Sequence, residues 1–152
     1  MQSLCLRLFS GAAMSATGFP MTAECACGAV TVTLAAPPRS MFHCACRDCQ
    51  KASGAEHVPL ILMREAEIEI AGAATAHRVT AESGAVTTRH FCPVCGSPVF
   101  GTSSRSPGAV LIPAGLLGAA ATWFVPRSVI FARSLMDWDQ IDATIRRHQT
   151  YG

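Results

Sequence analysis

Residues 43–54 read His43-Cys44-Ala45-Cys46-Arg47-Asp48-Cys49-Gln50-Lys51-Ala52-Ser53-Gly54. Within this stretch, Cys44, Cys46 and Cys49 fall inside six positions, which is too close for the cysteines of an ordinary core. Thiolates bind zinc well, and a zinc ion in a protein usually has four ligands in a tetrahedron. Three sulfurs from one loop do not complete that shell. Either a fourth ligand comes from another part of the chain, or the site keeps an open position for water or a substrate.

Two further cysteine pairs have similarly short spacings. One residue separates Cys25 from Cys27, two residues separate Cys92 from Cys95, and Cys5 brings the total to eight. In a short secreted chain, this number of cysteines would indicate a disulfide framework. Gaps of one and two residues instead favour metal chelation by reduced thiols. We therefore predict zinc sites and a reducing compartment, the cytoplasm.

Length and composition limit the classes of protein to which this chain can belong. At 152 residues it has the size of one domain, and half of its residues are apolar, so it can bury a core of its own. The net charge of +2, without any run of lysine and arginine, is too small to favour nucleic acid or an anionic membrane as a partner. No apolar stretch is long enough to cross a bilayer. We therefore predict neither nucleic-acid nor membrane partners.

The first twenty residues have the composition of a weak leader. Residues 4–9 are apolar, but Arg7 interrupts them and the small residues that follow are few, which makes a poor secretory signal. Met14 and Met21 offer later starts of translation. We predict that residues 1–20 are a disordered leader or precede the true start, and that residues 21–152 form a single domain.

Short strands are expected over most of the remaining chain. Alternating and β-branched runs between turn residues are typical of strands, and they occur at residues 29–34, 57–63, 67–70, 75–80, 86–91, 99–100, 109–112 and 129–131. Near the C-terminus, Asp137 and Gln140 have the spacing of a capping box. The residues Trp138, Ile141 and Ile145 would share one face of a short helix there, and we expect Trp138 in the core. The pattern predicts a mainly β domain with a short C-terminal helix.

Seven cysteines remain when Cys5 is assigned to the leader, and they can be divided in two ways. In the first division, a closed site of four sulfurs contains Cys25, Cys27, Cys92 and Cys95. An open site of three sulfurs then contains Cys44, Cys46 and Cys49. The second is an ordinary zinc ribbon made from Cys46, Cys49, Cys92 and Cys95. The ribbon leaves the pair at 25 and 27 unexplained, but the residues alone leave both divisions open.

Three blocks of the sequence resemble the glutathione-dependent formaldehyde-activating (GFA) family, which includes centromere protein V. The blocks are Cys25-Ala26-Cys27-Gly28, Cys44-Ala45-Cys46-Arg47-Asp48-Cys49-Gln50-Lys51-Ala52-Ser53-Gly54 and Phe91-Cys92-Pro93-Val94-Cys95-Gly96-Ser97-Pro98-Val99-Phe100. Their order and the gaps between them also match the family, over roughly residues 24–138. The resemblance implies the first division, with a structural zinc at the four cysteines and an active-site zinc at the three.

The resemblance also implies a fold and a reaction. The fold consists of several small, coiled antiparallel sheets around zinc knuckles, and zinc-bearing methionine sulfoxide reductases and a small guanine-exchange factor for Rab proteins share it. The reaction named for the family joins formaldehyde and glutathione into S-hydroxymethylglutathione, and its reverse is a carbon–sulfur lyase reaction. We therefore expect two zinc ions per chain, a zinc-dependent lyase-type enzyme, and a small thiol such as glutathione with an aldehyde as substrate.

The three-cysteine site is the expected catalytic centre, with Cys44, Cys46 and Cys49 as the catalytic residues. A zinc ion with an open position deprotonates a coordinating thiol and can polarise a carbonyl, and both effects favour attack of sulfur on an aldehyde. Arg47 and Lys51 can attract a substrate carboxylate. Alternatively, they are solvated surface charges or hydrogen-bond donors that neutralise the thiolates. We favour the second interpretation for these two cations.

Two other observations concern the histidines and the competing functions. His43 and His90 lie near the expected ligands, and we interpret both as packed strand residues. A zinc scaffold that binds a partner protein is the alternative function, and methionine sulfoxide reduction is a third for which only Cys5 is a spare thiol. A pocket over the three-cysteine site would favour the enzyme, whereas an exposed apolar patch elsewhere would favour the scaffold.

Overall fold

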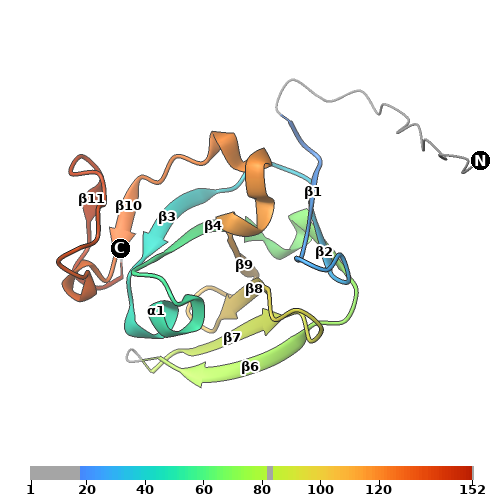
Figure 1. The fold of residues 1–152 in the computed structure, drawn as a ribbon, viewed down its shortest axis with the longest axis horizontal. Coiled ribbons are helices and arrows are strands. Elements are labelled where there is room, and N and C mark those ends of the chain that lie inside the picture. Colours follow the sequence, from blue (N-terminus) through green and yellow to red (C-terminus); the bar gives the residue numbers. More distant parts are fainter. Residues whose placement is uncertain (1–17, 82–83, 152) are drawn as a thin grey trace, which may run out of the picture.

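Two β-sheets form most of the computed structural model, which describes residues 18–81 and 84–151 (Figure 1). The smaller sheet is antiparallel and has the strand order β1-β2-β5. The larger sheet has the order β11-β10-β3-β4-β9-β8-β7-β6. Most of its pairs are antiparallel, but β10 runs parallel to both of its neighbours and places Ile130 opposite Cys44 of β3. The mainly β architecture predicted from the sequence is confirmed.

The elements of the described residues are short. The smaller sheet contains β1 (Met21–Glu24), β2 (Thr31–Leu34) and β5 (Ile68–Ala71). The larger sheet contains β3 (Ser40–Cys44), β4 (Val58–Arg64), β6 (Thr75–Thr80), β7 (Val86–Phe91), β8 (Pro98–Ser103), β9 (Ala109–Pro113), β10 (Ser128–Ile130) and β11 (Arg146–Arg147). The helical elements are α1 (Arg47–Ser53) and the 3₁₀ segments η1 (Glu65–Glu67), η2 (Ala114–Trp123) and η3 (Ala132–Ser134).

Alternating side chains build the main core between the two sheets. In β2, Val32 and Leu34 are fully buried, and the threonines that alternate with them are only half-buried. Pairing with β5 places Val32 opposite Ile70 and Leu34 opposite Ile68. These side chains pack with residues of the larger sheet such as Ile61 in one buried cluster. The period of two is what a strand with one buried face requires.

The two faces of the larger sheet carry different clusters. Ile61, Met63 and Ile112 belong to the main core, against the smaller sheet. Leu60 alternates with Ile61 along β4, and it packs in a second buried cluster that includes Cys44. The three-cysteine stretch therefore lies on the face of the larger sheet that is turned away from the smaller sheet.

The predicted C-terminal helix is wrong, because residues 136–145 form turns and extended segments that lead into β11. The Asp142 carboxylate accepts hydrogen bonds of 2.8 Å from both the backbone N–H and the hydroxyl of Thr144. Such local bonds compete with helix formation. Trp138, which we expected in the core, is 65% exposed. A helix this short needs an apolar face that packs on the protein, and the largest side chain of that face finds no such packing.

Phe19, which the predicted leader included, packs in the main core. The Phe19 side chain is buried, and the centroid of its ring lies 5.6 Å from that of Trp123. The rest of the predicted leader, with Cys5, falls on residues 1–17, which lie outside the described residues, and it stays a prediction there. Across the described residues, no helix has both the length and the apolar character that a bilayer span requires.

Candidate metal centres

Four cysteines from two distant turns meet at one place. Cys25 and Cys27 lie between β1 and β2, whereas Cys92 and Cys95 lie between β7 and β8, and all four sulfurs are within 4.8 Å of one another. The sulfurs of Cys25 and Cys27 are 3.6 Å apart, and those of Cys27 and Cys92 are 3.7 Å apart. A tetrahedral zinc site with Zn–S bonds of about 2.3 Å has sulfurs about 3.8 Å apart. The spacing of these sulfurs therefore fits a zinc ion.

The two turns share one backbone arrangement. The N–H of Gly28 donates to the carbonyl of Cys25, and that of Gly96 donates to the carbonyl of Cys92, both at 2.9 Å. Each glycine has a φ of 75°, a conformation that glycine adopts without steric cost. The N–H of Val30 also points at the Cys25 sulfur, at 3.3 Å. Such backbone donors stabilise a thiolate at this position.

Ser97 joins the two turns through its hydroxyl group. The backbone N–H of Ala26 donates to Ser97 Oγ at 3.2 Å, across 71 positions in the sequence. The same oxygen lies 3.2 Å from the Cys95 sulfur. Hydrogen bonding with Ser97 lowers the pKa of Cys95 to about 5. The hydroxyl therefore favours the ionised sulfur that a metal requires.

The three-cysteine site is built where β3 passes into α1. Cys44 is the last residue of β3, Cys46 is the N-cap of α1, and Cys49 lies in its first turn. The N–H of Cys49 donates to the Cys46 sulfur at 3.4 Å, as an N-cap side chain requires. Gly54 ends the helix with a φ of 71° and donates to the carbonyl of Gln50 at 2.8 Å. This short helix, which we had assigned to a loop, holds the three sulfurs within 4.8 Å of one another.

Contacts among the three thiols shift their pKa values in different directions. Hydrogen bonds with Cys44 and Cys49 lower the pKa of Cys46 to about 2. The hydrogen bond with Cys46, together with the one with Cys49, raises the pKa of Cys44. Ionisation of all three thiols would place like charges within 4.8 Å, which a bound cation would offset. Cys44 is buried while Cys46 and Cys49 are half-buried, so the donor set fits a soft divalent metal with one accessible side.

Comparison with models of protein families matches residues 20–134 to the family described as glutathione-dependent formaldehyde-activating enzyme (GFA). The chain belongs to the GFA family. All seven cysteines of the two clusters lie within the matched residues. Their grouping is the one that the sequence resemblance implies, and the described sulfurs do not form the ribbon grouping of Cys46 and Cys49 with Cys92 and Cys95.

Comparison with solved structures supports the fold of this GFA chain. A crystal structure of a Rhodobacter sphaeroides protein from a structural genomics programme matches with a TM-score of 0.53 and 18% sequence identity. The match covers 65% of this chain and 89% of that protein. At this identity the likeness concerns the fold alone. The search of curated proteins found no match to the chain.

Gln50 fixes α1 of the GFA chain against two other segments. Its side chain is buried, and its amide nitrogen donates to the carbonyl of Ser134 at 2.8 Å and to that of Glu56 at 2.9 Å. Its amide oxygen accepts a bond of 2.8 Å from Arg47, whose guanidinium also lies 3.4 Å from the Met136 sulfur. Arg47 therefore helps to pack α1 against the C-terminal segment.

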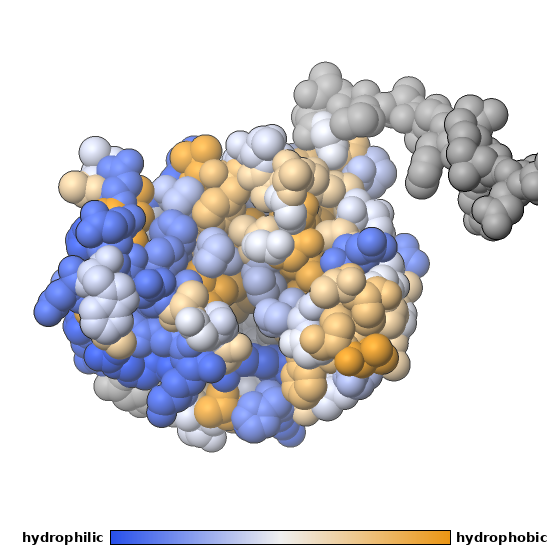
Figure 2. Space-filling view, viewed as in Figure 1, coloured by the Kyte–Doolittle hydropathy of each residue, from blue (hydrophilic) through white to orange (hydrophobic). Residues whose placement is uncertain are grey.

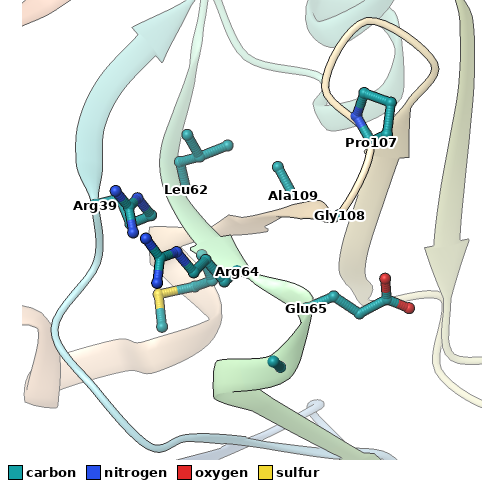
Figure 3. Close-up of a pocket in the computed structure, with 9 residues that line it drawn as sticks. Arg39, Leu62, Arg64, Glu65, Pro107, Gly108 and Ala109 are labelled. Atoms are coloured by element: carbon teal, nitrogen blue, oxygen red, sulfur yellow. The ribbon is translucent and has the colours of Figure 1, made fainter.

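Two cavities of the described residues are lined by no cysteine. A cavity of about 460 Å³ lies beside α1, between Arg47, Lys51 and Trp138, on the side where Figure 2 shows hydrophilic side chains gathered. A cavity of about 670 Å³ lies at the other end of β4, with Arg39 and Arg64 on one side and Glu65 on the other (Figure 3). Access to the three sulfurs is therefore through the half-buried Cys46 and Cys49, and not through either cavity.

Arg89 of β7 is a cation that the sequence analysis did not connect with the three-cysteine site. Arg89 lies on β7, and the charge of its guanidinium acts on the Cys49 thiol of α1. Forty positions separate these two residues in the sequence. Only the register of β7 within the larger sheet brings them together, and no local motif around Arg89 carries that information.

The histidines near the cysteines are packed residues, as interpreted from the sequence. His43 contacts the ring of His57, with centroids 4.3 Å apart, and burial lowers the pKa of His43 from 6.5 to about 4. His90 stacks on Phe100 of the neighbouring strand, with centroids 3.9 Å apart. Neither His43 nor His90 belongs to a cysteine cluster.

Proposed function

We propose that this GFA chain is a zinc-dependent enzyme of the carbon–sulfur lyase type, acting on the adduct of a small thiol and an aldehyde. Glutathione with formaldehyde is the proposed pair, as in the synthesis of S-hydroxymethylglutathione. The observation that carries the proposal is the grouping of the sulfurs, since four meet in one cluster and three in another, and no fourth ligand from residues 18–81 or 84–151 joins the three. A three-ligand site with an open position is typical of catalytic zinc, whereas a four-ligand site is typical of structural zinc.

The four-cysteine cluster is proposed to hold a structural zinc. Cys25 and Cys92 are buried, and the four sulfurs join the turn before β2 to the turn before β8. A metal there would connect the smaller sheet to the larger one, and closed sites of this kind contribute directly to folding.

The three-cysteine cluster is proposed to hold the catalytic zinc. In that position the metal would supply a Lewis acid and lower the pKa of a thiol that coordinates it. Cys44, from the buried end of β3, and Cys46 and Cys49, from the start of α1, would hold it at the edge of the second apolar cluster. In the reaction the thiol sulfur bonds to the carbonyl carbon, the C=O double bond becomes a single bond, and the oxygen takes the proton that the thiol released. No oxidant or reductant is needed.

The test begins with metal analysis of protein purified without added metal, for which we expect two zinc ions per chain. Formation of S-hydroxymethylglutathione from glutathione and formaldehyde is then followed against the spontaneous rate. We expect acceleration by the wild-type chain and none by Cys46→Ser. A fully metal-loaded wild-type chain that leaves the spontaneous rate unchanged would count against this substrate pair.

A non-catalytic zinc scaffold is the second candidate, and one observation favours it. Trp138 is 65% exposed beside α1. An exposed large aromatic residue is typical of surfaces that bind proteins. Binding of a partner that Trp138→Ala abolishes, together with the absence of thiol-dependent activity, would favour the scaffold. The cytoplasmic location and the absence of nucleic-acid and membrane partners remain part of our proposal.

A further inference from the structure

Arg89 lies on the face of the larger sheet that carries the three-cysteine site. Residues that are directly opposite in neighbouring antiparallel strands point to the same face. Arg89 of β7 is opposite Gly101 of β8, and Gly101 is opposite Leu111 of β9. Leu111 is in turn opposite Leu62 of β4. Every second residue of β4 counted from Leu62 points to the same face, and the pairing of β4 with β3 carries this face to Cys44. Leu111 and Cys44 indeed belong to the same apolar cluster.

The Arg89 guanidinium has no charged partner in the part of the chain that the structure describes. Among residues 18–81 and 84–151, no carboxylate lies within ion-pair distance of it, and no hydrogen bond satisfies its side chain. Its side chain is half-buried, and Gly101 directly opposite has no side chain that could cover it. An unpaired, partly desolvated cation on a sheet face is costly unless an anion compensates it.

Two other arginines near this face already contact neighbouring groups. Arg47 donates to Gln50 and contacts Met136, as described above. Arg105 lies over the ring of Tyr151, 4.0 Å from its centroid. Arg89, by contrast, acts electrostatically on the Cys49 sulfur. Of these three arginines, it is therefore the one whose charge acts on a sulfur of the three-cysteine site.

We propose that Arg89 is a specificity-determining residue of the three-cysteine site, and that its guanidinium offsets the negative charge that the sulfur of a thiol substrate adds there. The proposal rests on the proposed function. Three thiolates and one Zn²⁺ carry a net charge of −1, and a fourth thiolate makes the site more negative. A nearby positive charge lowers the cost of that addition, so the site favours thiolates over neutral molecules such as water.

The test measures thiol affinity in protein whose zinc is replaced by cobalt(II), using the visible ligand-field bands as the readout. The thiols are 2-mercaptoethanol, 3-mercaptopropionate, cysteamine and glutathione, whose tails differ in charge. The variants are Arg89→Gln and Arg89→Lys. The matched control is Arg78→Gln, which removes an exposed arginine from β6 that pairs with Thr88 and therefore lies on the opposite face of the sheet.

We expect Arg89→Gln to weaken the binding of all four thiols by about tenfold, the size of effect that one nearby charge produces. Arg89→Lys should keep most of the affinity because it keeps the charge, and Arg78→Gln should match the wild type. Three results would overturn the proposal: an unchanged Kd in Arg89→Gln at equal metal content, equal losses in Arg89→Lys and Arg89→Gln, or a loss confined to thiols with a carboxylate. A wild-type chain whose bands respond to no thiol would instead refute the proposed function.

Discussion

His57 Nδ1 lies 2.9 Å from Asp139 Oδ2, and this contact joins the residue before β4 to the C-terminal segment. The Asp139 side chain is 3% exposed and that of His57 is 22% exposed, so the pair is shielded from solvent. The segment that was expected to be a helix is thus held by a buried polar contact instead of an apolar face. Removal of the carboxylate would leave the imidazole without its partner.

Asp139→Ala should lower the free energy of unfolding by about 1.5–3 kcal/mol, the range for hydrogen bonds to charged groups. Urea denaturation of zinc-loaded protein measures this difference. The control is Asp137→Ala, because Asp137 is an exposed carboxylate two positions away. Equal stability of the two variants would show that the His57–Asp139 contact does not hold the segment.

Cys92→Ser should yield insoluble or unfolded protein. The Cys92 side chain is fully buried among the four sulfurs, and loss of one sulfur would remove a closed metal site that connects the two sheets. Solubility, far-UV circular dichroism and metal content measure the outcome. If Cys92→Ser stays folded with both metals bound, the structural role of this cluster is disproved.

Cys46→Ser should remain folded and lose only the second metal. The three sulfurs come from a single short stretch on the outer face of the larger sheet, and serine can still serve as an N-cap for α1. We expect one zinc per chain, a preserved circular dichroism spectrum and no response of cobalt-substituted protein to glutathione. Global unfolding of this variant would mean that the three-cysteine cluster is also structural.

Phe19→Ala should destabilise the domain by about 3 kcal/mol, the lower end of the range for truncating a buried phenylalanine. The reason is its packing against Trp123 in the main core. A chain that starts at Met21 should show a similar loss, whereas one that starts at Gly18 should not. Thermal unfolding of the three chains measures the difference, and identical melting temperatures would place Phe19 outside the core.

Stability should fall as the pH decreases from 6.5 to 4, and His43 should contribute to this loss. Its pKa is lowered from 6.5 to about 4 by burial, so the unfolded chain binds a proton in this window that the folded chain does not. His43→Phe removes that difference and should flatten the dependence. His77→Gln, at an exposed position of β6, is the control and should keep the wild-type slope.

The sequence predicted the strands whose alternating residues and flanking turns lie within one short stretch of the chain. The bounds of β6 and β7 match the prediction, because alternating residues flank a glycine-containing turn. The strand β3 and the helix α1 were not predicted as such. Ser40–Cys44 lacks a run of β-branched residues, and α1 has only seven residues, so its stability depends on the Cys46 cap and on Gln50.

The candidate sites were predicted unevenly for a related reason. Short spacings such as that of Cys92 and Cys95 signal a metal cluster within the sequence itself. The electrostatic link between Arg89 and Cys49 depends on the register of several strands, which no short motif specifies. Trp138 was assigned to the core because its residue type is usually buried, and the Asp142 turn overrides that tendency.

The parallel pairing of β10 with β3 also sets an order of events during synthesis. Ile130 lies opposite Cys44, and the N–H of Ala45 donates to the Ile130 carbonyl at 3.1 Å, so the edge of the three-cysteine site is finished by a late part of the chain. The last of the four clustered sulfurs, on Cys95, is made 35 residues earlier than Ile130. At about 5–20 residues per second, the ribosome needs about 2–7 seconds for that interval. Because Cys95 also leaves the ribosome before Ile130, the nascent chain can bring the four cysteines together before β10 is available to pair with β3 and border the three-cysteine site.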